Sequence, residues 1–103
     1  MDNSTKLLNQ IFELKSKIDQ EKLTEKFERN FQRLFSLLEE DGLYLKDPIG
    51  EPYSDSRTDV EASIVGEESS KMKITKVIKP IVYKKEGQSP VLLQKGVVIV
   101  EKA

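Results

Sequence analysis

The segment from Leu23 to Leu45 constrains the fold most, because its apolar residues recur at the spacing of one helix face. The recurring residues are Leu23, Phe27, Phe31, Leu34, Phe35 and Leu38. This pattern predicts a single amphipathic helix. Three phenylalanines on one face expose more apolar surface than a lone helix can cover. We therefore expect a partner helix to pack against this face.

The end of this helix is predicted from Gly42, which follows the last periodic turn. Glycine readily adopts the left-handed backbone conformation that the C′ position of a helix requires. Leu38 and Leu43 then occupy the C3 and C″ positions, whose side chains are in contact in a Schellman motif. We expect the chain to leave the helix at Gly42.

A second apolar stripe precedes this helix, with steps of four, three and four residues, the spacing of a coiled coil. It consists of Leu7, Ile11, Leu14 and Ile18. The stripe does not continue, because Glu21, Lys22 and Glu25 stand where apolar residues would be needed. Two interpretations remain open. Either the chain turns back in this stretch, with Asp19 or Thr24 available as the N-cap, or one long helix presents opposite faces to different neighbours.

Both interpretations predict a homodimer. An isolated pair of short helices buries little apolar surface, whereas two such pairs form a four-helix bundle. Residues 1–42 are thus predicted to be a helical dimerisation region. We assign the apolar residues of both stripes to the dimer interface: Leu7, Ile11, Leu14, Ile18, Leu23, Phe27, Phe31, Leu34, Phe35 and Leu38.

Residues 43–103 are predicted to form a small β-domain, so the expected fold class is α+β: helices of a dimeric bundle followed by strands. An acidic loop rich in Pro, Gly and Ser occupies residues 46–70. Strands are expected near residues 43–45, 60–65, 72–78 and 91–100, with Gly96 as a bulge and residues 84–88 as a turn. Pro80 and Pro90 are expected at strand starts or sheet edges.

Composition argues against enzymatic chemistry. The 103 residues include neither Cys nor His, which removes disulfides, thiolate zinc sites and the commonest general base. Asp55, Asp59 and Glu61 carry ligands for a hard cation, but they do not follow the spacing of an EF-hand. No glycine-rich phosphate loop is present either. We expect no catalytic residue, no metal site and no cofactor.

Charge and hydropathy set further expectations. Residues 47–70 carry 7 acidic and 1 basic residue, whereas residues 71–103 carry 2 acidic and 8 basic residues. The basic stretch has only Tyr83 as an aromatic residue and no Arg, so we interpret it as a solvated strand face rather than a nucleic-acid site. The apolar run at residues 97–100 is too short to span a membrane, and residues 1–4 lack the features of a signal peptide. We expect a cytoplasmic protein without nucleic-acid or membrane partners.

The order of these features resembles GrpE, the nucleotide exchange factor of DnaK-type chaperones. The best match runs from Glu25 to Leu45, with Gly42-Leu43 in place of the family's Gly-Val. Further similarity lies in residues 50–53, in Asp59, Glu61 and Ala62, and in residues 77–80 and 92–100. The family's His is absent, Pro80-Ile81 replaces Gly-Tyr, and Gln-Lys-Gly at residues 94–96 replaces Arg-Pro-Ala. The chain is similar to a short, diverged member.

The resemblance implies a stress-response co-chaperone that binds the ATPase domain of a DnaK-type chaperone and promotes ADP release without bond chemistry. It also implies that the helices build the homodimer and that the β-domain contacts the chaperone. The expected partner-binding residues are Lys84, Lys85, Gln94, Lys95, Val98 and Val100. The alternative is a dimeric protein-protein interaction module that shares the GrpE-like fold but has no exchange activity.

Overall fold

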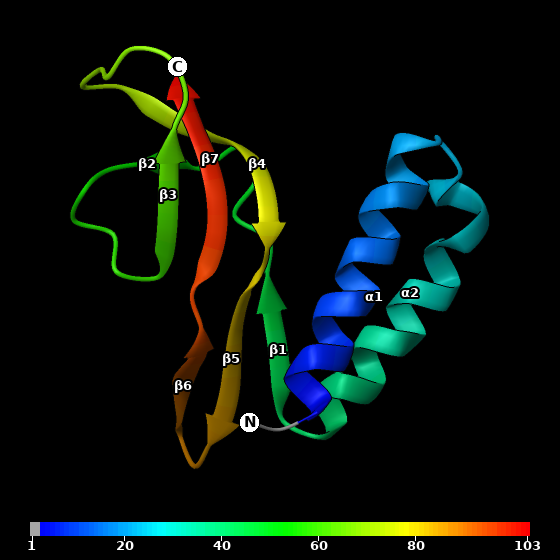
Figure 1. Cartoon of the computed structure of the whole chain (residues 1–103). Coiled ribbons are helices and arrows are strands. Elements are labelled where there is room, and N and C mark those ends of the chain that lie inside the picture. Colours follow the sequence, from blue (N-terminus) through cyan, green and yellow to red (C-terminus); the bar gives the residue numbers. More distant parts are fainter. Residues whose placement is uncertain (1–2) are drawn as a thin grey trace. The chain divides into compact units, whose positions relative to one another are not determined.

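The computed structural model describes residues 3–103, and two helices followed by β-sheets confirm the α+β class. The predicted helical region starts at residue 1, so its first two residues lie outside the described range. The elements in Figure 1 are α1 Asn3–Gln20, α2 Thr24–Glu40, β1 Leu43–Lys46, β2 Pro52–Tyr53, β3 Val60–Ile64, β4 Met72–Lys79, β5 Ile81–Glu86, β6 Ser89–Gln94 and β7 Gly96–Lys102.

The chain divides into two compact units. The helical unit combines the residues up to Tyr44 with Tyr83–Val91, and the sheet unit combines Leu45–Val82 with Leu92–Ala103. The switch from helix to strand at Leu43 lies where the sequence predicts it. The outer part of the β5–β6 hairpin, however, belongs to the same compact unit as the helices, and no local sequence pattern indicates this grouping.

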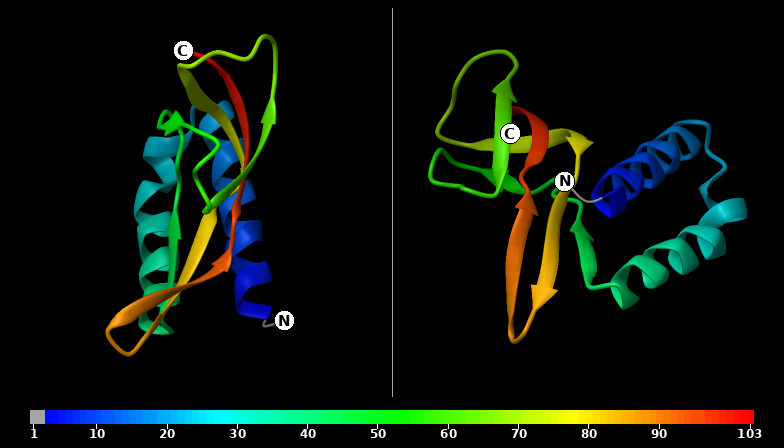
Figure 2. Two further views of the ribbon diagram at one scale, coloured as in Figure 1. Left: turned by 90° about the vertical axis from the view of Figure 1, so that its left-hand side faces the viewer. Right: turned by 60° about the horizontal axis from the view of Figure 1, so that its bottom comes forward.

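The structure decides between the two interpretations of the N-terminal region, because the chain turns back between α1 and α2. The two helices run side by side in opposite directions (Figures 1 and 2). Lys22 makes the turn without a glycine by adopting a φ of 60°. The predicted N-cap is corrected: Leu23 occupies that position without a side-chain cap. Thr24 instead donates its hydroxyl hydrogen bond to the Asp19 carboxylate across the turn.

The core of the helical unit comes from one face of each helix. Its buried apolar side chains on the helices are Leu8, Ile11, Phe12, Phe31 and Leu38. The Phe31 and Phe35 rings lie 6.5 Å apart, centroid to centroid, and are stacked. The partner helix that the phenylalanine-rich face requires is therefore α1 of the same chain.

Gly42 ends α2 as the sequence predicts. Its φ is +85°, and its N–H donates to the Glu39 carbonyl at 2.9 Å, one of the two bonds of a Schellman motif. Leu38 and Leu43, the flanking hydrophobic residues, are both buried. The local sequence of this helix end thus determines its geometry.

The first sheet has the strand order β1-β5-β6. Here two predictions need correction. The predicted turn at residues 84–88 is shorter, because β5 continues to Glu86 and only Gly87 and Gln88 form the turn. The single strand predicted near residues 91–100 is two strands, β6 and β7, separated at Lys95. Pro90 lies in the edge strand β6, as predicted.

The second sheet lies in the sheet unit and has the order β2-β4-β7-β3. β7 pairs antiparallel with β4 and parallel with β3 (Figure 2). Gly96 begins β7 and is not the predicted bulge. The register shifts lie within residues 74–79 of β4, and Gly96 pairs in regular register with Val60 of β3. A Cβ at Gly96 would come within 2.9 Å of the Ile81 side chain, so close packing explains the glycine. The core of this unit consists of Val60, Met72, Ile74, Ile81, Val82, Val98 and Val100.

Candidate protein-binding surfaces

Three of the residues assigned to a dimer interface are buried within the chain itself. Ile11, Phe31 and Leu38 pack in the core of the helical unit, and Phe31 is only 4% exposed. We therefore correct their assignment: they hold the helical hairpin together. The sequence pattern identified them as buried but could not say which neighbour covers them.

The other predicted interface residues remain accessible to different degrees. Leu7, Leu14, Leu23 and Leu34 are exposed, whereas Ile18, Phe27 and Phe35 are half-buried. Leu37, which is not among the predicted interface residues, is 59% exposed. Leu37 lies outside the stripe that contains the phenylalanines, so the stripe did not identify it. Residues three apart are neighbours on a helix surface, and the spacing of Leu34 and Leu37 is the signal that could have identified it.

These accessible residues share one side of the helical hairpin. At about 100° per residue, Leu7, Leu14 and Ile18 fall within about 40° on α1, and Leu23, Leu34 and Leu37 fall within about 60° on α2. On each helix, the accessible group is rotated about the helix axis away from the buried residues, and the sense of this rotation along the chain is the same for both helices. Because the helices are antiparallel, equal displacement places both groups on the same side. We call these six residues the apolar hairpin face.

The predicted partner-binding lysines of β5 do not point the same way. Successive side chains of a strand alternate between faces, so Lys84 and Lys85 lie on opposite sides of the sheet. Lys84 forms an ion pair with Glu86 at 3.9 Å. Lys85 is exposed and has no ion pair within the described part of the chain. Of these two lysines, only Lys85 therefore presents an uncompensated charge.

The predicted partner-binding residues of the sheet unit differ in accessibility. Lys95 is exposed, but the Gln94 side chain donates a hydrogen bond to the Pro80 carbonyl at 2.9 Å. Val98 and Val100 are 0% exposed. Their assignment as partner contacts is therefore corrected, because both side chains belong to the core of the sheet. Alternation along β7 directs them inward, and the sequence alone did not tell which face of this strand is covered.

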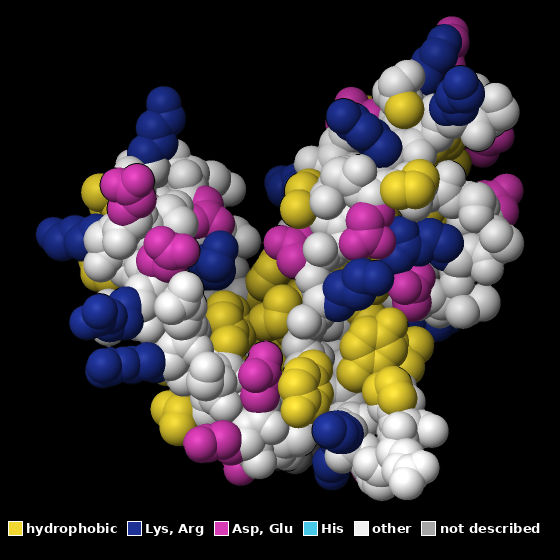
Figure 3. Space-filling model, turned by 180° about the vertical axis from the view of Figure 1, so that it is seen from behind, with side chains coloured by type: hydrophobic (Ala, Val, Ile, Leu, Met, Phe, Trp, Pro, Cys, Tyr) yellow, Lys and Arg dark blue, Asp and Glu magenta, His cyan; other side chains and the backbone are white. Residues whose placement is uncertain are grey.

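An apolar hollow lies on the helical unit, next to the tip of the β5–β6 hairpin, where hydrophobic side chains gather in Figure 3. Its volume is about 300 Å³. We call it the tyrosine hollow, and its lining residues are Tyr44, Tyr83, Lys85, Gln88 and Pro90. The three neighbouring strands β1, β5 and β6 and the hairpin turn contribute these residues. No local sequence pattern predicts the hollow, because strand pairing alone brings Tyr44 beside Tyr83.

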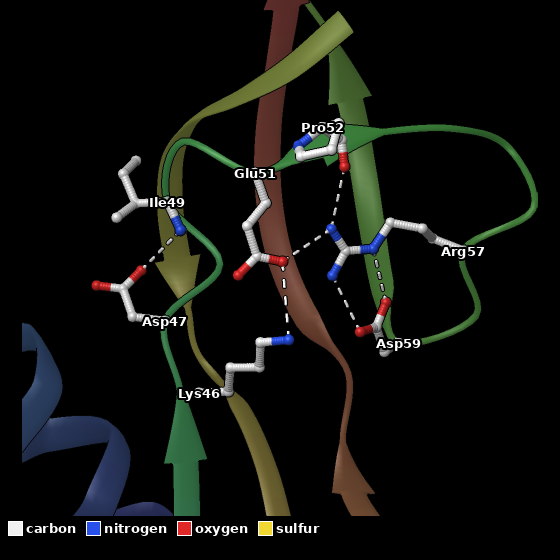
Figure 4. Close-up of polar contacts among 7 residues, drawn as sticks. All are labelled: Lys46, Asp47, Ile49, Glu51, Pro52, Arg57 and Asp59. Carbon is white, nitrogen blue, oxygen red and sulfur yellow. Dashed lines mark hydrogen bonds and ion pairs between the residues drawn. The ribbon is translucent and has the colours of Figure 1, made fainter.

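A polar cluster of the sheet unit is centred on Arg57 (Figure 4). Its guanidinium donates to both carboxylate oxygens of Asp59 at 3.0 Å, to Glu51 at 3.3 Å and to the Pro52 carbonyl at 3.2 Å. Lys46 lies 3.8 Å from the same Glu51 carboxylate. The hydrogen bonds from Arg57 lower the pKa of Asp59 and raise the pKa of Arg57, and burial opposes both shifts.

This cluster has a structural role. Arg57 uses all three guanidinium nitrogens in four hydrogen bonds within the chain, and these bonds fix the loop before β3. Asp59, considered above as a ligand for a hard cation, is occupied by Arg57. Across residues 3–103 no group of three or more acidic side chains is placed to hold a metal ion.

No helix within residues 3–103 combines the length and apolarity needed to cross a membrane.

No family model matches the sequence, and the comparisons with curated proteins and with solved structures likewise found no match. The exposed surfaces of the chain are therefore the observations that bear on its function.

Proposed function

We propose that the chain is a homodimeric, GrpE-like nucleotide exchange factor. The observation that carries the first part of this proposal is the apolar hairpin face. Leu14 and Leu37 are 52% and 59% exposed on the same side of a two-helix hairpin. A second copy of this face would cover both groups and produce a four-helix bundle.

The second part of the proposal concerns the partner. The order of elements is helical hairpin, glycine stop, loop and small β-sheets, which supports the resemblance to GrpE seen in the sequence. In this proposal the chain binds the ATPase domain of a DnaK-type chaperone and promotes the release of ADP. It does so by binding alone, in keeping with a chain that has neither Cys nor His.

The proposed chaperone contact is carried by exposed lysines. Lys85 and Lys95 are the accessible members of the set inferred from the sequence, and Lys84 is partly compensated by Glu86. An acidic partner surface would attract these charges, raise the association rate and make binding sensitive to salt. Gln94 contributes to the local structure instead, through its bond to Pro80.

The test is the release of a fluorescent ADP analogue from a DnaK-type chaperone with and without the full-length protein. We expect faster release, and we expect the double variant Lys85→Glu/Lys95→Glu to lose at least several-fold of this stimulation at low salt. The matched control is Lys73→Glu/Lys76→Glu, which changes two exposed β4 lysines and the net charge equally. If the parent dimer leaves the release rate unchanged, the exchange activity is disproved.

The second candidate is a dimeric interaction module without exchange activity. It is favoured by the loss of predicted contact residues, since Val98 and Val100 are buried and Gln94 bonds within the chain. Dimerisation in sedimentation experiments together with an unchanged ADP release rate would support this module. A monomer at tens of micromolar protein, a concentration suited to modest interfaces, would contradict both candidates.

A further inference from the structure

The tyrosine hollow has the properties of a small peptide-binding site. Its walls combine the rings of Tyr44, Tyr83 and Pro90, and its volume of about 300 Å³ is at the lower end for ligand pockets. Such a volume suits one or two side chains rather than a cofactor. Rigid ring walls favour a rigid ring as the occupant, because neither partner then loses much conformational entropy on binding.

A proline in an extended segment fits these walls best. Proline-rich segments in the polyproline II conformation have little conformational freedom left to lose, and they dock in grooves lined by aromatic side chains. The hollow offers such a surface across β1, β5 and β6, and it includes the ring of Pro90. Gln88 in the hairpin turn adds an amide that can bond to the peptide backbone.

The charge beside the hollow specifies the ligand further. Lys85 lines the hollow and has no ion pair in the described part of the chain, whereas the adjacent Lys84 is paired with Glu86. A carboxylate on the ligand would supply the missing partner and form a charge-assisted hydrogen bond. An acidic residue close to the proline is therefore the complementary feature.

We propose that the tyrosine hollow binds an extended partner segment in which a proline is followed closely by an acidic residue. The proline ring contacts Tyr44 and Tyr83, and the carboxylate meets the Lys85 ammonium. This inference goes beyond the proposed exchange function and does not depend on it. A chain without exchange activity or without dimerisation would still bind the peptide.

The test is a titration of the ¹⁵N-labelled full-length protein with a capped decapeptide that has a Pro-x-x-Pro-Asp core. We expect saturable shifts at the amides of Tyr44 and of residues 83–89, with a dissociation constant of about 1 mM or tighter. Replacing both prolines of the peptide by alanine, or its Asp by Lys, should weaken binding on the order of tenfold.

Lys85→Glu should weaken binding by a similar factor while leaving the ring walls and the melting temperature unchanged. Lys76→Glu is the matched control, because it makes the same charge change at an exposed β4 position that does not line the hollow. Equal binding of the proline-free peptide, or equal binding to Lys85→Glu, would overturn the proposal. The absence of saturable shifts at several millimolar peptide, well beyond the expected constant, would also overturn it.

Discussion

At the scale of single residues, Gly42 shows how one backbone conformation ends a helix. Its φ of +85° is strained for any residue with a branched Cβ, although the nearest atom to such a Cβ would be the Lys85 carbonyl oxygen at a comfortable 3.5 Å. The constraint is thus conformational and not steric crowding by neighbours. We expect Gly42→Val to lower the free energy of unfolding by about 1–2 kcal/mol.

Urea denaturation would measure this loss, with Gly42→Asn as the control. Asparagine visits the left-handed conformation more readily than valine does, so its variant should lose clearly less stability. Equal losses in both variants would show that the conformation of Gly42 is not the cause.

Asp59 gives a pH-dependent prediction at the same scale. Arg57 lowers the pKa of Asp59 in the folded state, so the pair contributes stability above the ordinary aspartate pKa and loses it as the pH falls. We expect Asp59→Asn to cost about 1 kcal/mol at neutral pH, because the side chains of Arg57 and Asp59 are 18% and 25% exposed. The difference from the parent should shrink below about pH 4. Urea denaturation at several pH values would measure it, and a difference independent of pH would contradict the argument.

At the scale of elements, the helical hairpin separates residues that look equivalent in the sequence. Phe31 and Leu37 lie on the same amphipathic helix, yet the first is buried against the hairpin core and the second is exposed. We expect Phe31→Ala to destabilise the hairpin by about 3 kcal/mol through the cavity it leaves. Leu37→Ala, measured in dilute protein, should change stability by less than about 1 kcal/mol. Thermal denaturation of both variants would test this, and similar losses would refute the distinction.

The same elements show what the sequence can predict and why it stops there. The end of α2 was predictable because Leu38, Gly42 and Leu43 interact within a few residues. The turn between α1 and α2 was ambiguous because Lys22 adopts a positive φ that usually signals glycine or asparagine. Contacts between distant segments could not be predicted, because periodicity identifies an apolar stripe but not the element that covers it.

The strands illustrate this limit for the binding surfaces. The exposed lysines of the basic stretch were predicted from charge alone, and Lys85 and Lys95 are indeed accessible. Val98 and Val100 share one face of β7, and only the folded chain shows that this face is buried. The tyrosine hollow depends on the pairing of β1 with β5, which no local pattern in the sequence encodes.

At the scale of the whole molecule, the two proposed surfaces have different consequences. In the proposed dimer the apolar hairpin face joins two copies, and each copy carries its own tyrosine hollow and exposed lysines. Such a dimer would present two of the proposed binding sites, and a partner with two matching segments would bind more tightly through effective concentration. Disrupting the dimer should weaken such bivalent binding without affecting a single short peptide.

The dimer itself gives the last prediction. The double variant Leu14→Glu/Leu37→Glu places one charge on each helix of the apolar hairpin face, where a second copy would bury both without a partner. We expect the parent to sediment as a dimer at tens of micromolar protein and the variant as a monomer, because buried unpaired charges cost several kcal/mol. Since both leucines are more than half exposed, the far-UV circular dichroism of the variant should still report a folded hairpin. The control is Gln32→Glu, an exposed position on the opposite side of α2, which should leave the dimer intact. A variant that remains dimeric would show that the copies associate through another surface.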